Sequence, residues 1–260
     1  MPLQIPTAIE AAGLAVGPTT AFRWNADVYR AFTYPENAAL ERSYEALSPR
    51  AAYGLIAALG EWMIWRVRGR VTDAQHRDLL HRVEAAWVAA DDPGRVTWTE
   101  LPWDDKAKDK SAMGLIALVT LFFEEGLKDL REITAGGDED VVFVWAVGAT
   151  LASRHVWAKK RAAFAAWEKR VLPRLKKLYA GVYDPARPVV RSAFFGDPAP
   201  SAAELPALHA QFLAAVDPAN PYLGKAKTKA KAKAKAKPTA PRSGRRSGAK
   251  PQRGAARSLR

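Results

Sequence analysis

The sequence predicts an all-α protein, with a single multi-helix domain of about six to eight helices and a disordered basic C-terminal tail. Apolar residues recur at helical spacing in one segment after another, and capping or helix-stopping residues separate these segments. No run shows the strict alternation of a half-buried strand. Because 48% of the residues are hydrophobic and nine are tryptophan, the chain has ample material for a buried core.

The first predicted helices lie in the region before residue 68. Residues 36–47 are predicted to form a short helix, and Ser48 with Pro49 suits the N-cap and first position of the helix that follows. That helix runs to about Arg68 and is apolar on every side except a narrow edge at Glu61. We therefore expect it to be the central helix, with Glu61 facing water.

Three further helices are predicted between residues 72 and 157. Thr72 is the N-cap of a helix that runs to about Ala90. After a loop at 93–110, which contains the short possible strand "RVTWT", mostly apolar helices are expected at 111–134 and 138–157. The tetrapeptide "GLIA" occurs at 54–57 and again at 114–117. It leaves a helical repeat as an alternative to a chance match in an alanine- and leucine-rich chain.

The last predicted helices lie in a more polar part of the chain. A helix from about Ala158 carries Phe164, Val171 and Leu178 at seven-residue spacing, which indicates a packing seam. Pro173 is expected to kink or divide it. A proline-rich loop, "YDPARPVVRSAFFGDPAP", then leads to a final helix near 201–216.

The net charge of +13 is unevenly distributed. Residues 224–260, here called the tail, hold 14 Lys or Arg and no Asp or Glu, whereas residues 1–223, here called the head, have a net charge of −1. Within the head, residues 91–140 carry −7 and residues 141–191 carry +9. This partition indicates a cationic arm joined to a nearly neutral helical domain.

The tail begins with "KAKTKAKAKAKAKP", in which a lysine stands at every second position. This spacing spreads the charges around a helix and leaves no apolar face, so we expect the tail to be disordered and to bind polyanions. It has no aromatic residue for stacking on bases, so sequence specificity is not expected. The predicted nucleic-acid-binding residues of the tail are Lys225, Lys227, Lys229, Lys231, Lys233, Lys235, Lys237, Arg242, Arg245 and Arg246.

In composition the tail resembles the lysine- and alanine-rich tails of linker histones and of some bacterial nucleoid proteins. The resemblance covers residues 224–260 only and implies nonspecific association with DNA or RNA. A solubilising extension without a partner is the alternative. The basic helix before the tail could extend the same polyanion track, through Lys159, Lys160, Arg161, Lys169 and Arg170, or its cations could pair with the acidic segment of the head.

No residue of the head is predicted to be catalytic. The chain has no cysteine and no P-loop, nucleophile-elbow or dinucleotide-binding motif, so neither a metal nor a cofactor is expected. "HRDL" at 76–79 matches part of the kinase catalytic loop, but the required asparagine is replaced by Val83. The acids at 124, 125 and 129 form either a buried carboxylate group or a solvent edge paired with Lys128 and Arg131.

Two functional hypotheses follow. The first is a non-enzymatic interaction protein whose tail binds nucleic acid while the helical head binds a protein partner. The alternative is an immunity or antitoxin-type protein whose head neutralises a toxin, with the acidic segment 91–140 mimicking nucleic acid. The longest uncharged apolar runs, 111–123 and 141–153, are shorter than the roughly 18–20 residues of a spanning helix, so we expect no transmembrane segment and a cytoplasmic protein. The oligomeric state stays open.

Overall fold

The computed structural model describes residues 3–13, 26–99, 110–137, 141–157 and 161–224. These residues form α-helices and short 3-10 turns, and no strand occurs among them. The prediction of an all-α domain is therefore confirmed. The chain separates into a unit at Met1–Ala226 and a second at Lys227–Arg260, and the second lies wholly outside the described residues.

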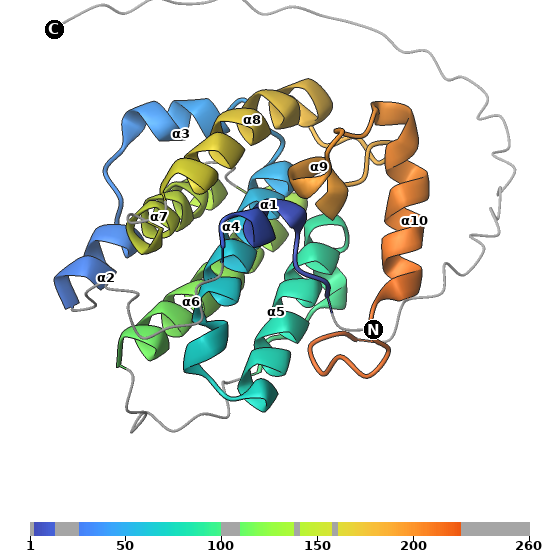
Figure 1. Cartoon of the computed structure of the whole chain (residues 1–260). Helices are drawn as coiled ribbons and strands as arrows, with labels where there is room; N and C mark the ends of the chain where they lie inside the picture. Colours follow the sequence, from blue (N-terminus) through green and yellow to red (C-terminus); the bar gives the residue numbers. More distant parts are fainter. Residues whose placement is uncertain (1–2, 14–25, 100–109, 138–140, 158–160, 225–260) are drawn as a thin grey trace, which may run out of the picture. The chain divides into compact units, whose positions relative to one another are not determined.

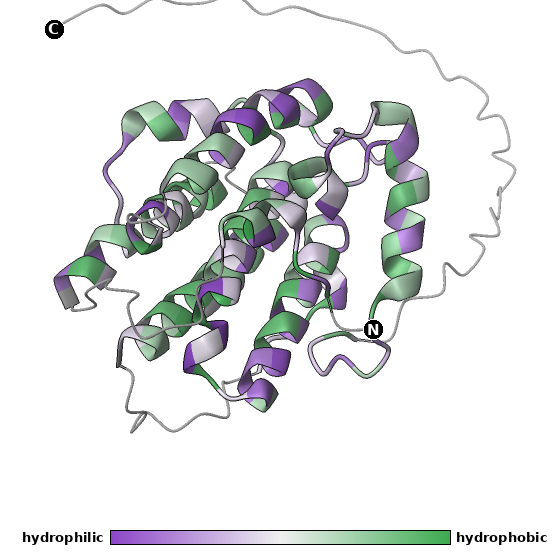
Figure 2. Ribbon diagram, in the orientation of Figure 1, coloured by the Kyte–Doolittle hydropathy of each residue, from purple (hydrophilic) through white to green (hydrophobic). Residues whose placement is uncertain are grey.

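The centre of the fold is α4 (Pro49–Val67), which is buried along almost its whole length. It begins at the predicted cap, where Ser48 Oγ accepts a hydrogen bond from the Ala51 N–H. Three long helices pack around it, namely α5 (Asp73–Asp91), α6 (Lys110–Thr134) and α7 (Val141–Val156) (Figure 1). Hydrophobic residues are frequent along α4, α6 and α7, whereas the first turns of α5 are largely hydrophilic (Figure 2). The expectation that this helix is central is confirmed.

Glycines allow the close approach of α4 and α6. Gly60 of α4 faces the ring of Phe123, and Gly126 of α6 faces Tyr53 near the other end of the contact, so the two helices run antiparallel. The Tyr53 hydroxyl, which is fully buried, donates to the Phe123 carbonyl at 3.0 Å. Because α4 contacts α5, α6, α7 and α9 (Arg191–Phe195), the arrangement differs from a solenoid, in which each repeat touches only its neighbours.

Short helices cover the outside of this core. They are α1 (Thr7–Ala11), α2 (Ala26–Thr33), α3 (Ala38–Tyr44) and α9. Only α3 was predicted, within residues 36–47. Helices of five to eight residues are too short to show a periodic pattern and are stabilised mainly by tertiary contacts.

The edge of α4 that was predicted to face water is covered. Glu61 is 0% exposed, and its carboxylate accepts hydrogen bonds from the indole N–H groups of Trp65 at 3.4 Å and Trp87 at 3.0 Å. Arg191, at the start of α9, donates Nε–H to the same carboxylate at 2.9 Å. The prediction for Glu61 was wrong because its partner lies 130 residues further along the chain, beyond the reach of a local pattern.

The C-terminal part of the head contacts α5 through side chains at both ends of α10. In Figure 1, α10 (Leu205–Ala215) lies beside α5. His209 Nε2 lies 3.4 Å from Asp91 Oδ2 at one end, and His81 Nε2 lies 3.4 Å from Asp217 Oδ2 at the other. These two contacts place the helix antiparallel to α5.

The turn after α10 is held by buried polar contacts. The Asn220 side-chain amide donates to Glu84 Oε2 and to the His81 carbonyl, both at 2.8 Å. Further on, Val96 and Leu223 form an isolated β-bridge. The predicted strand "RVTWT" is therefore absent among the described residues, and only this single bridge stands in its place.

His76, near the start of α5, makes stability depend on pH. Its ring is buried, lies 5.0 Å from the Trp65 ring, and leaves Nε2 without a hydrogen-bond partner. Burial, together with the charge of Arg68, lowers the pKa of His76 from 6.5 to about 4. As pH falls from 6.5 to about 4, the unfolded chain binds a proton that the folded protein does not bind.

We therefore expect His76 to reduce the free energy of unfolding by about 3 kcal/mol over that acid range. Urea unfolding of the wild type and of His76→Phe between pH 4 and pH 8 measures the effect, because phenylalanine preserves the aromatic packing and cannot titrate. The variant should lose less stability than the wild type toward pH 4. Parallel stability curves for the two proteins would contradict the assignment.

Candidate nucleic-acid interface

The candidate interface is the outer face of α8 (Arg161–Tyr179). The predicted seam is confirmed, because Phe164, Val171 and Leu178 are all buried against the core. The opposite face is exposed and includes Pro173, and α8 continues through this proline without being divided. A proline on the solvent side costs the helix one hydrogen bond but no core contact.

Three cations occupy the exposed face of α8, namely Lys169, Arg170 and Lys177. Among the described residues, none of the three forms an ion pair. Exposed cations without internal partners remain available to the phosphates of a polyanion. The structure thus brings two predicted site residues, Lys169 and Arg170, onto one face and adds Lys177 to them.

Two other cations of the basic region are occupied within the fold. Arg154 of α7 makes a two-pronged contact with Glu168 of α8, with distances of 2.6–3.2 Å. Arg174 Nη1 donates to the carbonyls of Ala193 and Gly196, at 3.3 and 2.8 Å. Arg154 is therefore neutralised by a carboxylate, whereas the hydrogen bonds of Arg174 use Nη1 alone and leave its charge without a described ion-pair partner.

The other predicted site residues have no described side chains. Lys159 and Lys160 lie outside the described residues, and Arg161 begins α8 without a described side chain. The tail residues also lie outside the described part of the chain. They are Lys225, Lys227, Lys229, Lys231, Lys233, Lys235, Lys237, Arg242, Arg245 and Arg246.

The acids of α6 pair locally and not with α8. Glu124 Oε1 lies 3.5 Å from Nη1 of Arg82 on α5, and Glu125 pairs with Lys128 at 3.5 Å. Asp129 is buried and accepts a 2.6 Å hydrogen bond from the indole N–H of Trp145. The three carboxylates therefore have three different partners.

The pKa values of Glu124 and Asp129 are both raised, mainly because the two carboxyl groups are partly buried. The expected pairing of Arg131 with these acids is absent, because Arg131 donates to the carbonyls of Pro93 and Val96 instead. The internal-pairing alternative for the basic helix thus finds no support in the described residues of α6.

A second surface feature could serve a protein partner. A groove of about 600 Å³ lies between the start of α4, the end of α6 and the start of α7. Apolar side chains predominate in it, while Arg50 and Glu45 add charge. Val182, at its rim, is 91% exposed, which is unusual for an aliphatic side chain.

No protein-family model, curated protein or solved structure matches this chain. Over the described ranges, no three His, Cys, Asp or Glu side chains are grouped so that they could hold a metal ion. In the same ranges, no helix has both the length and the apolar character needed to cross a membrane.

One candidate site was not predicted from the sequence. A recess borders the basic face of α8 and is lined by residues of α1, α8 and α9. The i,i+4 spacing of Arg170 and Arg174 was visible in the sequence. The segment that closes the recess, residues 194–197, is about twenty positions away and gave no signal.

Proposed function

We propose that the protein is a non-enzymatic interaction protein that binds nucleic acid without sequence preference and presents its helical head to a protein partner. The observation that carries this proposal is the partition of charge, with 14 cations and no acid in the tail and a net of −1 in the head. The three unpaired cations on α8 support it, because they add a cationic surface to the head.

The physical basis is counterion release. Each lysine or arginine that neutralises a phosphate frees condensed cations, so affinity falls as salt rises. Contacts of this kind do not depend on the bases, so duplexes of unrelated sequence should bind with similar affinity.

The antitoxin alternative would require free carboxylates on the acidic segment. In the described part of that segment, Glu124, Glu125 and Asp129 are engaged by Arg82, Lys128 and Trp145. A surface that mimics nucleic acid needs carboxylates that face a partner. These contacts engage three of the thirteen acids of the segment, whereas Glu132 is exposed without an ion pair among the described residues and seven acids lie outside them. The antitoxin-type function therefore remains the alternative proposal.

The contribution of α8 can be measured by replacing Lys169, Arg170 and Lys177 together with glutamine in the full chain. Fluorescence anisotropy with a labelled duplex over a salt series gives the slope of log affinity against log salt. We expect the slope to become shallower by up to about three units, since each lost phosphate contact removes about one.

A matched control removes the same charge from other faces. Arg30, Arg77 and Lys128 lie on α2, α5 and α6 and are exposed, so their joint replacement by glutamine also lowers the net charge by three. This control should retain a steeper slope than the α8 variant. Equal slopes for the two variants would refute a specific role for α8.

A further inference from the structure

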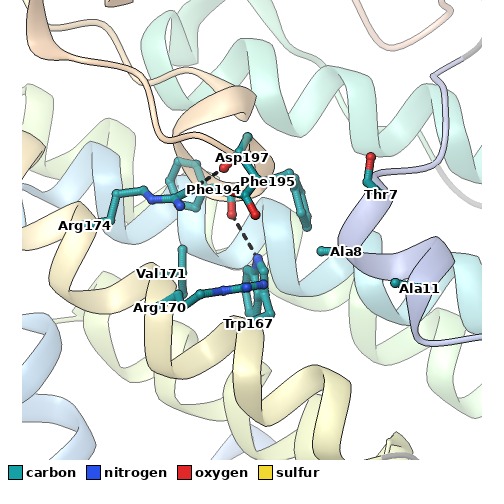
Figure 3. Close-up of a pocket in the computed structure, with 11 residues that line it drawn as sticks. Thr7, Ala8, Ala11, Trp167, Arg170, Val171, Arg174, Phe194, Phe195 and Asp197 are labelled. Carbon is teal, nitrogen blue, oxygen red and sulfur yellow. Dashed lines mark hydrogen bonds between the residues drawn. The ribbon is translucent and has the colours of Figure 1, made fainter.

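A small recess borders the basic face of α8. It measures about 240 Å³ and lies between α1, α8 and the end of α9 (Figure 3). Its walls combine aromatic rings, two guanidinium groups and one carboxylate. The lining residues used below are Trp167, Arg170, Arg174, Phe195 and Asp197.

Two arginines form the cationic side of the recess. Arg170 and Arg174 lie one turn apart on α8, and Arg174 is held in place by its hydrogen bonds to the carbonyls of Ala193 and Gly196. Burial lowers the pKa of Arg174, and the charge of Arg170 lowers it further, although Asp197 opposes this effect. Neither arginine forms an ion pair with a described carboxylate.

Arg170 is exposed and Arg174 is half-buried, and their like charges repel, so a bound anion would be attracted to both. A phosphate monoester carries about −1.5 to −2 charges at neutral pH, which matches two guanidinium groups better than the single charge of a carboxylate does.

An aromatic pair, with Trp167 from α8 and Phe195 from α9, lines the recess beside the arginines. The rings of Trp167 and Phe195 are stacked, with centroids 5.8 Å apart and an interplanar angle of 22°. The Trp167 indole N–H donates to the Phe194 carbonyl at 2.9 Å, which fixes the indole (Figure 3). A cavity of 240 Å³ is smaller than the usual range of about 300–1,000 Å³ for drug-sized ligands, so the ligand must be small.

We infer that this recess binds a small phosphate monoester, with its phosphate at Arg170 and Arg174 and its flat apolar part against Trp167 and Phe195. Such a group can come from a free phosphate ester or from the 5′-phosphate end of a nucleic acid strand, and only the second source rests on the proposed function. Asp197 lies at the exposed edge of the recess and weakens the attraction for the dianion.

Calorimetry of the full chain with phenyl phosphate tests the inference, with phenol as the uncharged probe. Phenyl phosphate should bind and phenol should not. Arg170→Gln should weaken binding about tenfold, because it removes a charge-assisted hydrogen bond. Asp197→Asn should strengthen it a few-fold, and this opposite sign separates electrostatics from structural damage.

Arg77→Gln is the control, since it removes one exposed charge on α5, away from the recess. This control should bind phenyl phosphate like the wild type. Failure of the wild type to bind phenyl phosphate would overturn the inference. Equal affinities for Arg170→Gln, Arg77→Gln and the wild type would also overturn it.

The source of the phosphate is settled with two otherwise identical oligonucleotides, one with a 5′-phosphate and one with a 5′-hydroxyl. Tighter binding of the phosphorylated strand by the wild type, lost in Arg170→Gln, supports the strand end as the ligand. Equal binding of the two strands, with phenyl phosphate still bound, supports a free ester. Phenyl phosphate binding without nucleic-acid binding would refute the proposed function and leave the recess as a small-molecule site.

Discussion

Replacing Arg191 by methionine should lower the free energy of unfolding by about 3–5 kcal/mol, because it leaves the charge of Glu61 buried and uncompensated. Glu61 is 0% exposed, and after the substitution only the indole N–H groups of Trp65 and Trp87 would contact its carboxylate. Urea unfolding at neutral pH measures the loss. Methionine keeps most of the side-chain length, so lost packing contributes little.

The reverse substitution, Glu61→Gln, is the informative comparison. Arg191 is about one-fifth exposed and also donates to the Gln4 carbonyl at 2.7 Å, so water can solvate it when the carboxylate is gone. The amide retains one oxygen that can accept an indole N–H. We therefore expect a smaller loss of about 1–2 kcal/mol. An Arg191→Met variant as stable as the wild type would contradict the account of this buried pair.

The second large effect is expected at Gly148, where α7 meets α2. An added Cβ would overlap the carbonyl oxygen of Phe32 and would press against the Phe122 ring at 3.1 Å. The Phe32 carbonyl group belongs to the backbone and cannot rotate away as a flexible side chain can. The added methyl group would therefore force α2 to shift. Gly148→Ala should therefore lower the free energy of unfolding by about 2–4 kcal/mol, which thermal and urea unfolding can measure.

Gly94→Ala is the matched control for this substitution. Its added Cβ would meet only Asp92 Oδ1, at the ordinary contact distance of 3.5 Å. Alanine at such a position restricts the unfolded chain and typically stabilises a protein by about 0.4–1 kcal/mol. If both variants were equally stable, the tight contact between α2 and α7 would be refuted.

The long helices were predictable because their signals are local. The cap at Ser48 and the capping box of Thr72 with Gln75 each lie within four residues of the helix start that they stabilise. The seam at Phe164, Val171 and Leu178 is likewise a property of one segment. Such local patterns can be recognised without knowing which other elements pack against the helix.

The sequence-based predictions failed where tertiary contacts determine whether a residue is buried or a short helix forms. Glu61 lies on the least apolar edge of its helix, and only the arrival of Arg191 makes that edge buried. The short helices α1, α2 and α9 carry too few turns for a periodic signal. Their formation depends on the surfaces that they cover.

The residues of the candidate site also fall into two groups, those that a local pattern could indicate and those that only the tertiary structure brings together. Lys169 and Arg170 were predicted from the charge of one segment; both are exposed, and their role in binding stays a prediction. The sequence could not indicate that Arg174 is bound to backbone carbonyls near residue 196, nor that Asp197 joins it in a recess. Both depend on a segment about twenty residues away.

The salt dependence of nucleic-acid binding by the full chain and by residues 1–226 tests the central claim most directly. Truncation after Ala226 retains the hydrogen bond from the Gly224 N–H to the Arg95 carbonyl and removes 13 of the 14 tail cations. The account predicts a steep decrease of log affinity with log salt for the full chain and a much shallower one for the truncated chain. Equal affinities and equal slopes for the two proteins would contradict it.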